Sequence, residues 1–141
     1  MVLGAIYFIY DKSLVRIKIL QIFKTKWFER FARKNSIDDS VLIEAVDRAE
    51  NGLIDADLGG GVIKQRIARK GQGKSRGYRS IIIVSYGEMA FFVFGFPKNE
   101  RDNLRQDEEE EYREMARYLL SIPKKDLSEG LAKGDFVEVL G

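Results

Sequence analysis

Seven cationic side chains fall within one stretch of the chain, residues 62–86, which contains no Asp or Glu. The whole chain is almost neutral, with a formal net charge of +2, so the remainder carries 2 minus 7, or −5. A local excess of positive charge favours a phosphate-rich partner. The seven residues are Lys64, Arg66, Arg69, Lys70, Lys74, Arg76 and Arg79.

Two strands joined by a glycine-rich loop are expected to position these cations. Val62–Ala68 and Tyr78–Tyr86 are rich in β-branched and apolar residues, and three glycines lie between them. Side chains two positions apart on a strand share a face, so Lys64 and Arg66 point the same way, and Arg79 can lie across from them. Three positive groups would then converge on one sheet surface. For any single cation, the alternative is an ordinary solvated face of a hairpin.

The composition limits the chemistry that is open to an enzyme. The chain has 141 residues, 45% of them hydrophobic, which is enough for one compact domain with a real core. It contains no cysteine, which excludes disulfides and thiol nucleophiles, and no histidine, which excludes the usual proton shuttle near neutral pH. Any catalysis must therefore use other side chains.

The order of the predicted elements indicates an α+β fold, β-α-α-β-β-β-α with a small tail. Alternating apolar residues predict strands, and apolar residues three and four apart after capping side chains predict helices. The elements are, in order, a strand at 15–23, helices capped by Thr25 and by Asp38 or Asp39, a turn at 57–61, strands at 62–68, 78–86 and 89–96, a helix at 100–121 and a tail with a short helix and a last strand.

Residues 1–18 are expected to form an N-terminal extension that is loosely attached to a domain at 19–141. Met1–Tyr10 is apolar but much shorter than the roughly 20 residues of a membrane span. Charged residues follow it with no small-residue cleavage site, which argues against a secretory signal. We therefore expect no membrane attachment and a cytoplasmic location.

Four collinear segments carry a family resemblance. Together they resemble the RelE/HigB group of bacterial toxins, from about Ile19 to the C-terminus, and residues 1–18 have no recognised counterpart. The most specific part is Gly-Lys-x-x-Gly-x-Arg leading into a strand, followed by an aromatic strand that ends in a Lys. The segments are Phe23-Lys24-Thr25-Lys26-Trp27-Phe28, the run from Gly52 to Arg66, Gly71-Gln72-Gly73-Lys74-Ser75-Arg76-Gly77-Tyr78-Arg79 and Phe94-Gly95-Phe96-Pro97-Lys98-Asn99.

The resemblance implies the microbial RNase-like RelE fold, with an antiparallel sheet, two N-terminal helices and a C-terminal helix. It also implies a toxin that is paired with a cognate antitoxin and that cleaves messenger RNA in the ribosomal A site. In such enzymes the RNA 2′-OH attacks the neighbouring phosphorus and leaves a 2′,3′-cyclic phosphate and a 5′-hydroxyl. This reaction needs a base, charge stabilisation on the phosphoryl oxygens and help for the leaving oxygen. No metal or other cofactor is expected.

By position, Lys64 and Arg66 resemble the paired basic residues of the family's second strand, and Arg79 resembles the arginine after its glycine turn. Lys64 would act as the base, since nearby like charges disfavour its protonated form, and the two arginines would hold the phosphoryl group. Lys98 would assist the leaving oxygen. Some members of the family have an arginine and a tyrosine in this region, whereas this chain has Asn99 and no aromatic residue up to Arg105. The proton donor, the codon preference and the oligomeric state stay open.

The other four cations, Arg69, Lys70, Lys74 and Arg76, are expected to bind the RNA backbone rather than to react. Two other functions remain open. One is an RNA-binding module without catalytic activity that uses the same cationic sheet, and the other is a relative of these toxins that poisons a topoisomerase through protein contacts. The clustering of Lys64, Arg66 and Arg79 argues against the topoisomerase alternative.

Overall fold

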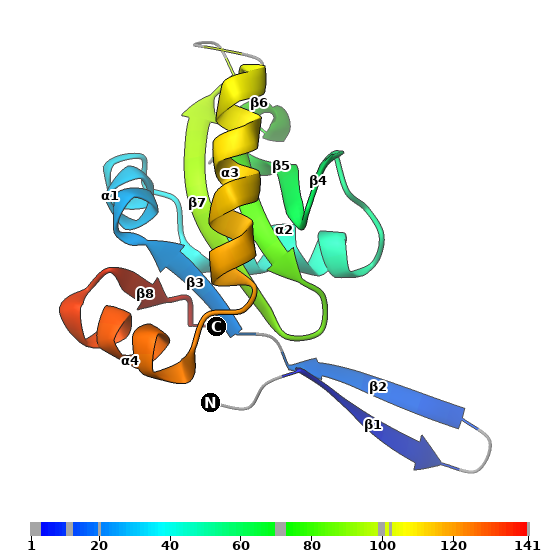
Figure 1. The fold of residues 1–141 in the computed structure, drawn as a ribbon. Coiled ribbons are helices and arrows are strands. Elements are labelled where there is room, and N and C mark those ends of the chain that lie inside the picture. Colours follow the sequence, from blue (N-terminus) through cyan, green and yellow to red (C-terminus); the bar gives the residue numbers. More distant parts are fainter. Residues whose placement is uncertain are drawn as a thin grey trace.

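The computed structural model describes the placement of residues 4–10, 13–19, 21–69, 73–98, 101 and 103–140, and it describes the side chains of residues 21–68, 77–98, 101 and 103–140. Eight strands and four helices lie within these ranges (Figure 1). In chain order they are β1 (Gly4–Tyr10), β2 (Ser13–Ile19), β3 (Gln21–Thr25), α1 (Lys26–Lys34), α2 (Asp39–Glu50), β4 (Ala56–Gly59), β5 (Val62–Arg69), β6 (Gly73–Ser85), β7 (Met89–Pro97), α3 (Gln106–Leu119), α4 (Lys124–Lys133) and β8 (Phe136–Glu138).

Six strands form one sheet in the order β4-β5-β6-β7-β3-β8. Every neighbouring pair is antiparallel except β3 and β7, which run parallel. The two helices α1 and α2 follow the first strand of this sheet, and α3 and α4 follow β7. The α+β class and the largely antiparallel sheet predicted from the sequence are therefore confirmed.

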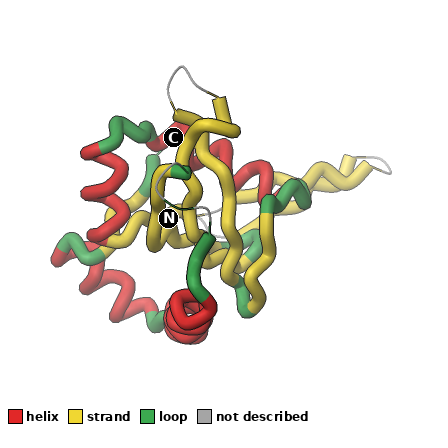
Figure 2. Tube along the Cα trace, turned by 90° about the horizontal axis from the view of Figure 1, so that it is seen from above, coloured by secondary structure: helices red, strands yellow, loops and turns green. Residues whose placement is uncertain are grey.

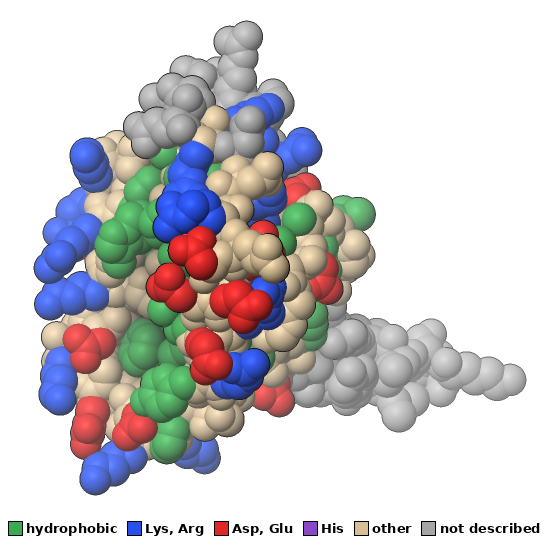
Figure 3. All heavy atoms as spheres, turned by 45° about the horizontal axis from the view of Figure 1, so that its top comes forward, with side chains coloured by type: hydrophobic (Ala, Val, Ile, Leu, Met, Phe, Trp, Pro, Cys, Tyr) green, Lys and Arg blue, Asp and Glu red, His purple; other side chains and the backbone are tan. Residues whose placement is uncertain are grey.

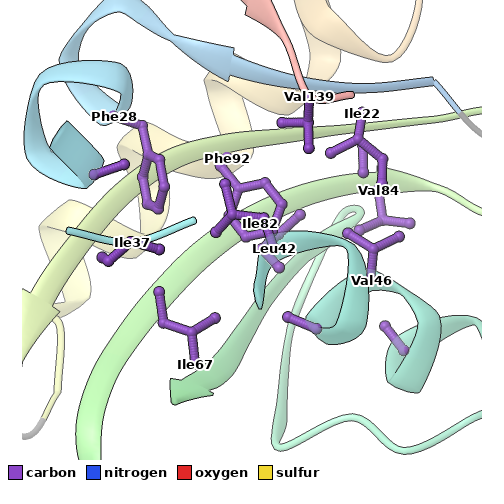
Figure 4. Packing of buried hydrophobic residues seen from close by; sticks show 14 of the residues in the cluster. Ile22, Phe28, Ile37, Leu42, Val46, Ile67, Ile82, Val84, Phe92 and Val139 are labelled. Carbon is purple, nitrogen blue, oxygen red and sulfur yellow. The ribbon is translucent and has the colours of Figure 1, made fainter. Parts of the chain in front are cut away.

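Helices cover both faces of the sheet. One core contains Phe28 of α1, Leu42 of α2 and sheet residues such as Ile82 (Figure 4). The other core contains Ala116 and Leu119 of α3 with sheet residues of the opposite parity, such as Ile81. Successive side chains of a strand point to opposite faces, so the two cores lie on either side of β6. Figure 2 shows α3 nearly end-on along one side of the strands, with helices also on the other side.

Three predicted boundaries are wrong. The strand predicted at residues 15–23 is split between β2 and β3, because Val15–Ile19 pairs with β1 rather than with the large sheet. The turn predicted at 57–61 contains the short edge strand β4, which pairs with β5. The helix predicted from Glu100 begins only at Gln106. The short helix and the last strand predicted in the tail are present as α4 and β8.

The loop predicted between the two cationic strands is also too long. Strand β5 continues to Arg69 and strand β6 begins at Gly73, with an irregularity in their pairing after Ile67. Arg69, Lys74 and Arg76 therefore lie within strands by their backbone, not on a loop. Lys70 lies outside the described residues, as do the side chains of the other three.

The N-terminal strands β1 and β2 form a two-stranded antiparallel sheet of their own (Figure 1). In the figure this hairpin extends away from the six-stranded sheet. The predicted boundary between residues 18 and 19 falls at the end of β2 and stays a prediction. None of the helices in the described ranges is long and apolar enough to cross a bilayer.

Candidate functional site

The register of β5 and β6 places three of the predicted site residues on one face. Arg66 lies directly opposite Arg79, and Lys64 lies opposite Ile81, two positions further along the same face. Same-face rows of a strand are about 7 Å apart, so Lys64 stands one row from the arginine pair. The strand β7 continues this face with Phe96 beside Arg79 and Phe94 beside Ile81. It is the face that α3 covers further down.

The three cations differ in their exposure. Arg79 is on the central strand β6 and is only 8% exposed, whereas half of the Arg66 side chain, 49%, is in contact with solvent. Lys64 is intermediate. A cation in a partly desolvated site acts more strongly on a nearby charge than one in water. Arg79 is therefore suited to act as a fixed charge, and Arg66 is accessible to a ligand.

An acidic residue from the neighbouring loop fixes the backbone of Arg66. The Arg66 N–H donates to Asp55 Oδ2 at 2.6 Å, and its Nε lies 3.9 Å from Asp55 Oδ1. Arg48 of α2 donates to the Arg66 carbonyl and lies 3.6 Å from Asp55 Oδ2. The buried Gln65 side chain accepts the Asp55 N–H at 2.7 Å and so holds the loop against β5. The Asp55 carboxylate thus holds the backbone of β5 in place. It lies at ion-pair rather than hydrogen-bond distance from the Arg66 guanidinium.

The segment before α3 supplies the partner of Lys64. Lys64 Nζ donates to Asn103 Oδ1 at 2.6 Å, and among the described residues Lys64 makes no ion pair with a carboxylate. The carbonyl of Asn103 accepts hydrogen bonds from Arg101 at 3.0 and 3.2 Å. A neutral amide oxygen orients the amine without adding a negative charge beside it.

Arg101 and Glu108 hold this segment in place. The two terminal guanidinium nitrogens of Arg101, Nη1 and Nη2, donate to the Glu108 carboxylate, which also accepts the Arg105 N–H at 2.8 Å. The hydrogen bonds from Arg101 and then from Arg105 lower the pKa of Glu108 from 4.5 to about 2. The Arg101 guanidinium also lies 5.4 Å from the centre of the Phe96 ring. The ion pair of Arg101 with Glu108 and the contact of Arg101 with the Phe96 ring therefore tie the start of α3 to the strand residue that flanks Arg79.

Lys98, the fourth predicted catalytic residue, is exposed just beyond the end of β7. The backbone N–H of Lys98 donates a hydrogen bond to the Gly77 carbonyl of β6 at 3.5 Å. Gly77 is two positions from Arg79 and four from Ile81, the residue opposite Lys64. At about 3.4 Å per residue, Lys98 and Lys64 are roughly 14 Å apart in the direction of the strands, and they lie on either side of β6 with the arginine pair between them.

Three residues near this face were not singled out from the sequence. They are Asp55, Arg101 and Asn103, and each lies outside the cationic segment. The only local signal is the pairing of Arg105 with Glu108 three residues later, which resembles a capping box and marks the start of α3. Their contacts with β5 depend on tertiary structure.

The surface around this face carries both charges. Figure 3 shows a group of Lys and Arg side chains above a row of acidic side chains, with further Lys and Arg side chains along the left edge and among the acidic ones below. The first half of α3 is acidic from Asp107 to Glu111, and two of these residues, Glu109 and Glu110, pair with Arg113 of the same helix. Within the described part of the chain there is no group of three or more acidic side chains that could hold a metal ion.

The chain is similar to a known protein family. A sequence model described as the RelE toxin of the RelE / RelB toxin-antitoxin system matches residues 20–139, which is most of the chain and includes every element of the six-stranded sheet. No curated protein sequence matches the chain significantly.

Proposed function

Since the chain belongs to the RelE toxin family and is thus a toxin of a toxin-antitoxin system, we propose that it cleaves messenger RNA in the ribosomal A site. The observation that carries the proposal is the direct pairing of Arg66 with Arg79, with Lys64 on the same face. We place the catalytic unit in residues 19–141 and treat residues 1–18 as an extension. The reaction would take place in the cytoplasm.

The arrangement of the cations suits cleavage by the RNA 2′-OH. Lys64 would act as the base that takes the proton of the 2′-OH while the 2′ oxygen bonds to phosphorus. The bond from phosphorus to the 5′ oxygen breaks, and Lys98 would supply a proton or a positive charge to that oxygen. Attacking and leaving oxygens lie on opposite sides of the phosphorus in such displacements. Lys64 and Lys98 lie on opposite sides of the arginine pair, which is the order that this geometry requires.

The two arginines would share the charge that develops on the phosphoryl oxygens. Guanidinium groups match these oxygens with two parallel donors, and fixed donors of this kind contribute strongly to catalysis. Arg79, largely buried, would act as the fixed partner, and the half-exposed Arg66 would engage the phosphate as it arrives. This mechanism uses neither a metal nor another cofactor.

The end of the β5–β6 hairpin would bind the RNA backbone through Arg69, Lys70, Lys74 and Arg76. Each phosphate contact should appear as a slope of roughly −0.7 to −0.9 in the dependence of log affinity on log salt. Members of this family act with a cognate antitoxin, and we expect an acidic segment of that partner to cover the same basic face. The ribosome would position the message, so the isolated toxin is expected to cleave poorly.

The test is cleavage mapping on programmed ribosomes with the native protein and with Arg79→Ala and Arg66→Ala. The native protein should produce fragments that end in a 2′,3′-cyclic phosphate and begin with a 5′-hydroxyl. Each substitution should slow cleavage by about 10²- to 10³-fold, as for other lost transition-state donors. Because Arg79→Ala removes a buried side chain, Arg66→Ala keeps the test valid if the first variant does not fold. Arg117→Ala, which removes an exposed cation of α3, is the matched control and should cleave normally.

Two results would replace this proposal with the alternatives. Binding to RNA with intact message on translating ribosomes would indicate an RNA-binding module. Intact message together with stabilised topoisomerase–DNA complexes, unaffected by Arg66→Ala, would indicate a topoisomerase poison.

A further inference from the structure

The outer half of β7 is covered by a helix rather than by a strand. Strand β3 pairs with β7 only along Met89–Phe92, and in the described part of the chain no strand continues this pairing beyond Phe92. The Phe31 ring of α1 lies over Gly95 on the face of the sheet that packs against α1, where an added Cβ would come within 2.5 Å of the ring. The absence of a side chain at Gly95 therefore allows α1 to pack against this edge.

This packing leaves Trp27, on the first turn of α1, 44% exposed at the edge of the sheet. Its ring centre lies 5.3 Å from that of Phe31, with the planes 16° apart, and 4.7 Å from that of Phe94. Phe94 in turn stacks on Tyr112 of α3 at 6.0 Å. We call Trp27, Phe94 and Tyr112 the aromatic row. It connects α1 to α3 across the end of β7.

The aromatic row adjoins the candidate site. Phe94 lies 5.9 Å from Phe96, the residue opposite Arg79, and the Arg101 guanidinium lies over the Phe96 ring. Phe94 and Phe96 are two positions apart on one strand, about 7 Å. A strand of RNA with a phosphate at the arginine pair would therefore have its neighbouring nucleotides within reach of Trp27.

The helix that carries Trp27 is basic. Its exposed cations are Lys26, Arg30, Arg33 and Lys34, and its single acidic residue, Glu29, is already bound to Lys24 at 2.8 Å and to Arg33 at 2.7 Å. Figure 3 shows Lys and Arg side chains along the left edge of the molecule, with hydrophobic side chains between them and the central basic group. An exposed aromatic plane flanked by positive charge complements unpaired bases on a phosphate backbone.

From these observations we infer that Trp27 is a stacking position for an unpaired base of the RNA, while the cations of α1 hold the adjoining backbone. The inference rests on the proposed function, because it takes the RNA strand held at Arg66 and Arg79 as its starting point. It extends the binding surface beyond the cationic sheet, from Arg79 in the first half of β6 around the edge of β7 to α1. Stacking is tolerant of sequence, since every base has an aromatic face.

Trp27 is the only tryptophan of the chain, so its fluorescence reports on this position alone. The full-length protein is titrated with a short single-stranded RNA of mixed sequence, with a hairpin RNA of equal phosphate number and with inorganic polyphosphate. We expect the single strand to quench the fluorescence with salt-sensitive saturation. The hairpin and the polyphosphate should bind through charge and quench much less.

Affinities for the same labelled single strand are then measured by anisotropy with substituted proteins. Trp27→Ala should weaken binding about ten-fold, within the range for the loss of one base–aromatic stack, and Trp27→Phe should weaken it less than about three-fold. Tyr86→Ala is the matched control, because Tyr86 is 47% exposed but lies in the turn at the opposite end of β7. Its affinity should be unchanged.

The inference is overturned if Trp27→Ala binds the single strand as the native protein does, or if the hairpin quenches as strongly as the single strand. It is also overturned if the binding of an acidic peptide, and not the binding of RNA, depends on Trp27. Cleavage on ribosomes separates this inference from the proposed function. Cleavage by both the native protein and Trp27→Ala at equal rates removes only the stacking position, and Trp27-dependent binding without any cleavage removes only the enzymatic proposal.

Discussion

Replacing Glu108 with Gln should loosen the segment that orients Lys64. In the native protein the Glu108 carboxylate binds Arg101 through two hydrogen bonds and accepts the N–H of Arg105. Arg101 also donates a hydrogen bond to the Asn103 carbonyl, and the Asn103 side chain accepts a hydrogen bond from the Lys64 amine. A neutral amide at position 108 keeps the shape of the side chain but loses the charge that makes these bonds strong.

The magnitude follows from the pKa of Glu108, which the Arg101 hydrogen bonds and the Arg105 N–H lower from 4.5 to about 2. A difference of this size corresponds to about 3 kcal/mol for a group shielded from water. This pair lies at the surface, where solvent screens it, so we expect Glu108→Gln to lower the free energy of unfolding by about 1 to 2 kcal/mol at pH 7. Because the pKa is lowered in the folded state, the stabilisation is complete above about pH 4.5 and is lost as the pH falls toward 2.

Urea unfolding of the native and Glu108→Gln proteins between pH 7 and pH 2 measures this directly. The gap in stability should be widest at pH 7 and close as the pH falls. Glu114→Gln removes an exposed carboxylate of the same helix that pairs with the exposed Arg117, and it should change stability by less than about 0.5 kcal/mol. Asn103→Ala should slow cleavage without this loss of stability. The reasoning would be refuted if the native and Glu108→Gln proteins differed in stability equally at pH 7 and pH 2. Normal cleavage by both Glu108→Gln and Asn103→Ala would also refute it.

Three further predictions concern other contacts of the fold and the site. Lys24→Met should lower the free energy of unfolding by about 2 to 4 kcal/mol in urea titrations, because Lys24 is buried and bridges Glu29 and Asp39 at 2.8 and 2.9 Å. Asp55→Ala should slow ribosomal cleavage about ten-fold by freeing the Arg66 backbone, and Asp55→Asn, which keeps an acceptor, should restore part of the rate. Gly61→Ala should lower the melting temperature more than Gly52→Ala does: both glycines have positive φ, but an added Cβ meets Leu120 at 2.6 Å only at Gly61.

The parts of the fold that were predicted correctly depend on neighbours in sequence. Thr25 caps α1 as expected, with its Oγ1 accepting the Phe28 N–H at 3.3 Å. The alternation of β5 gives Lys64 and Arg66 the same face, and the short connection to β6 brings Arg79 opposite Arg66. These geometric expectations are met because hairpin pairing is local. The catalytic roles of the three residues stay predictions.

The parts that were missed depend on contacts between distant segments. The parallel pairing of β3 with β7 joins residues that are far apart in the chain, and no periodicity marks it. Asp38 precedes α2 but makes no side-chain cap, and Asp39 instead binds Lys24 of β3 and the Leu140 N–H near the C-terminus. The late start of α3 has a local cause instead, since Glu108 accepts the Arg105 N–H at the first turn and also binds Arg101.

The two arginines at the centre of the site show what a sequence pattern leaves undecided. Both are the same residue type and both lie on strands of one hairpin, so alternation assigns them equal positions. Arg79 is on a strand with neighbours on both sides and lies beside Phe96, whereas Arg66 is on β5 beyond the last pairing with β4 at Lys64. The sheet therefore shields Arg79 from water and leaves Arg66 accessible. Since the strength of a charge depends on this shielding, the number of neighbouring strands, rather than the residue type, distinguishes the two arginines.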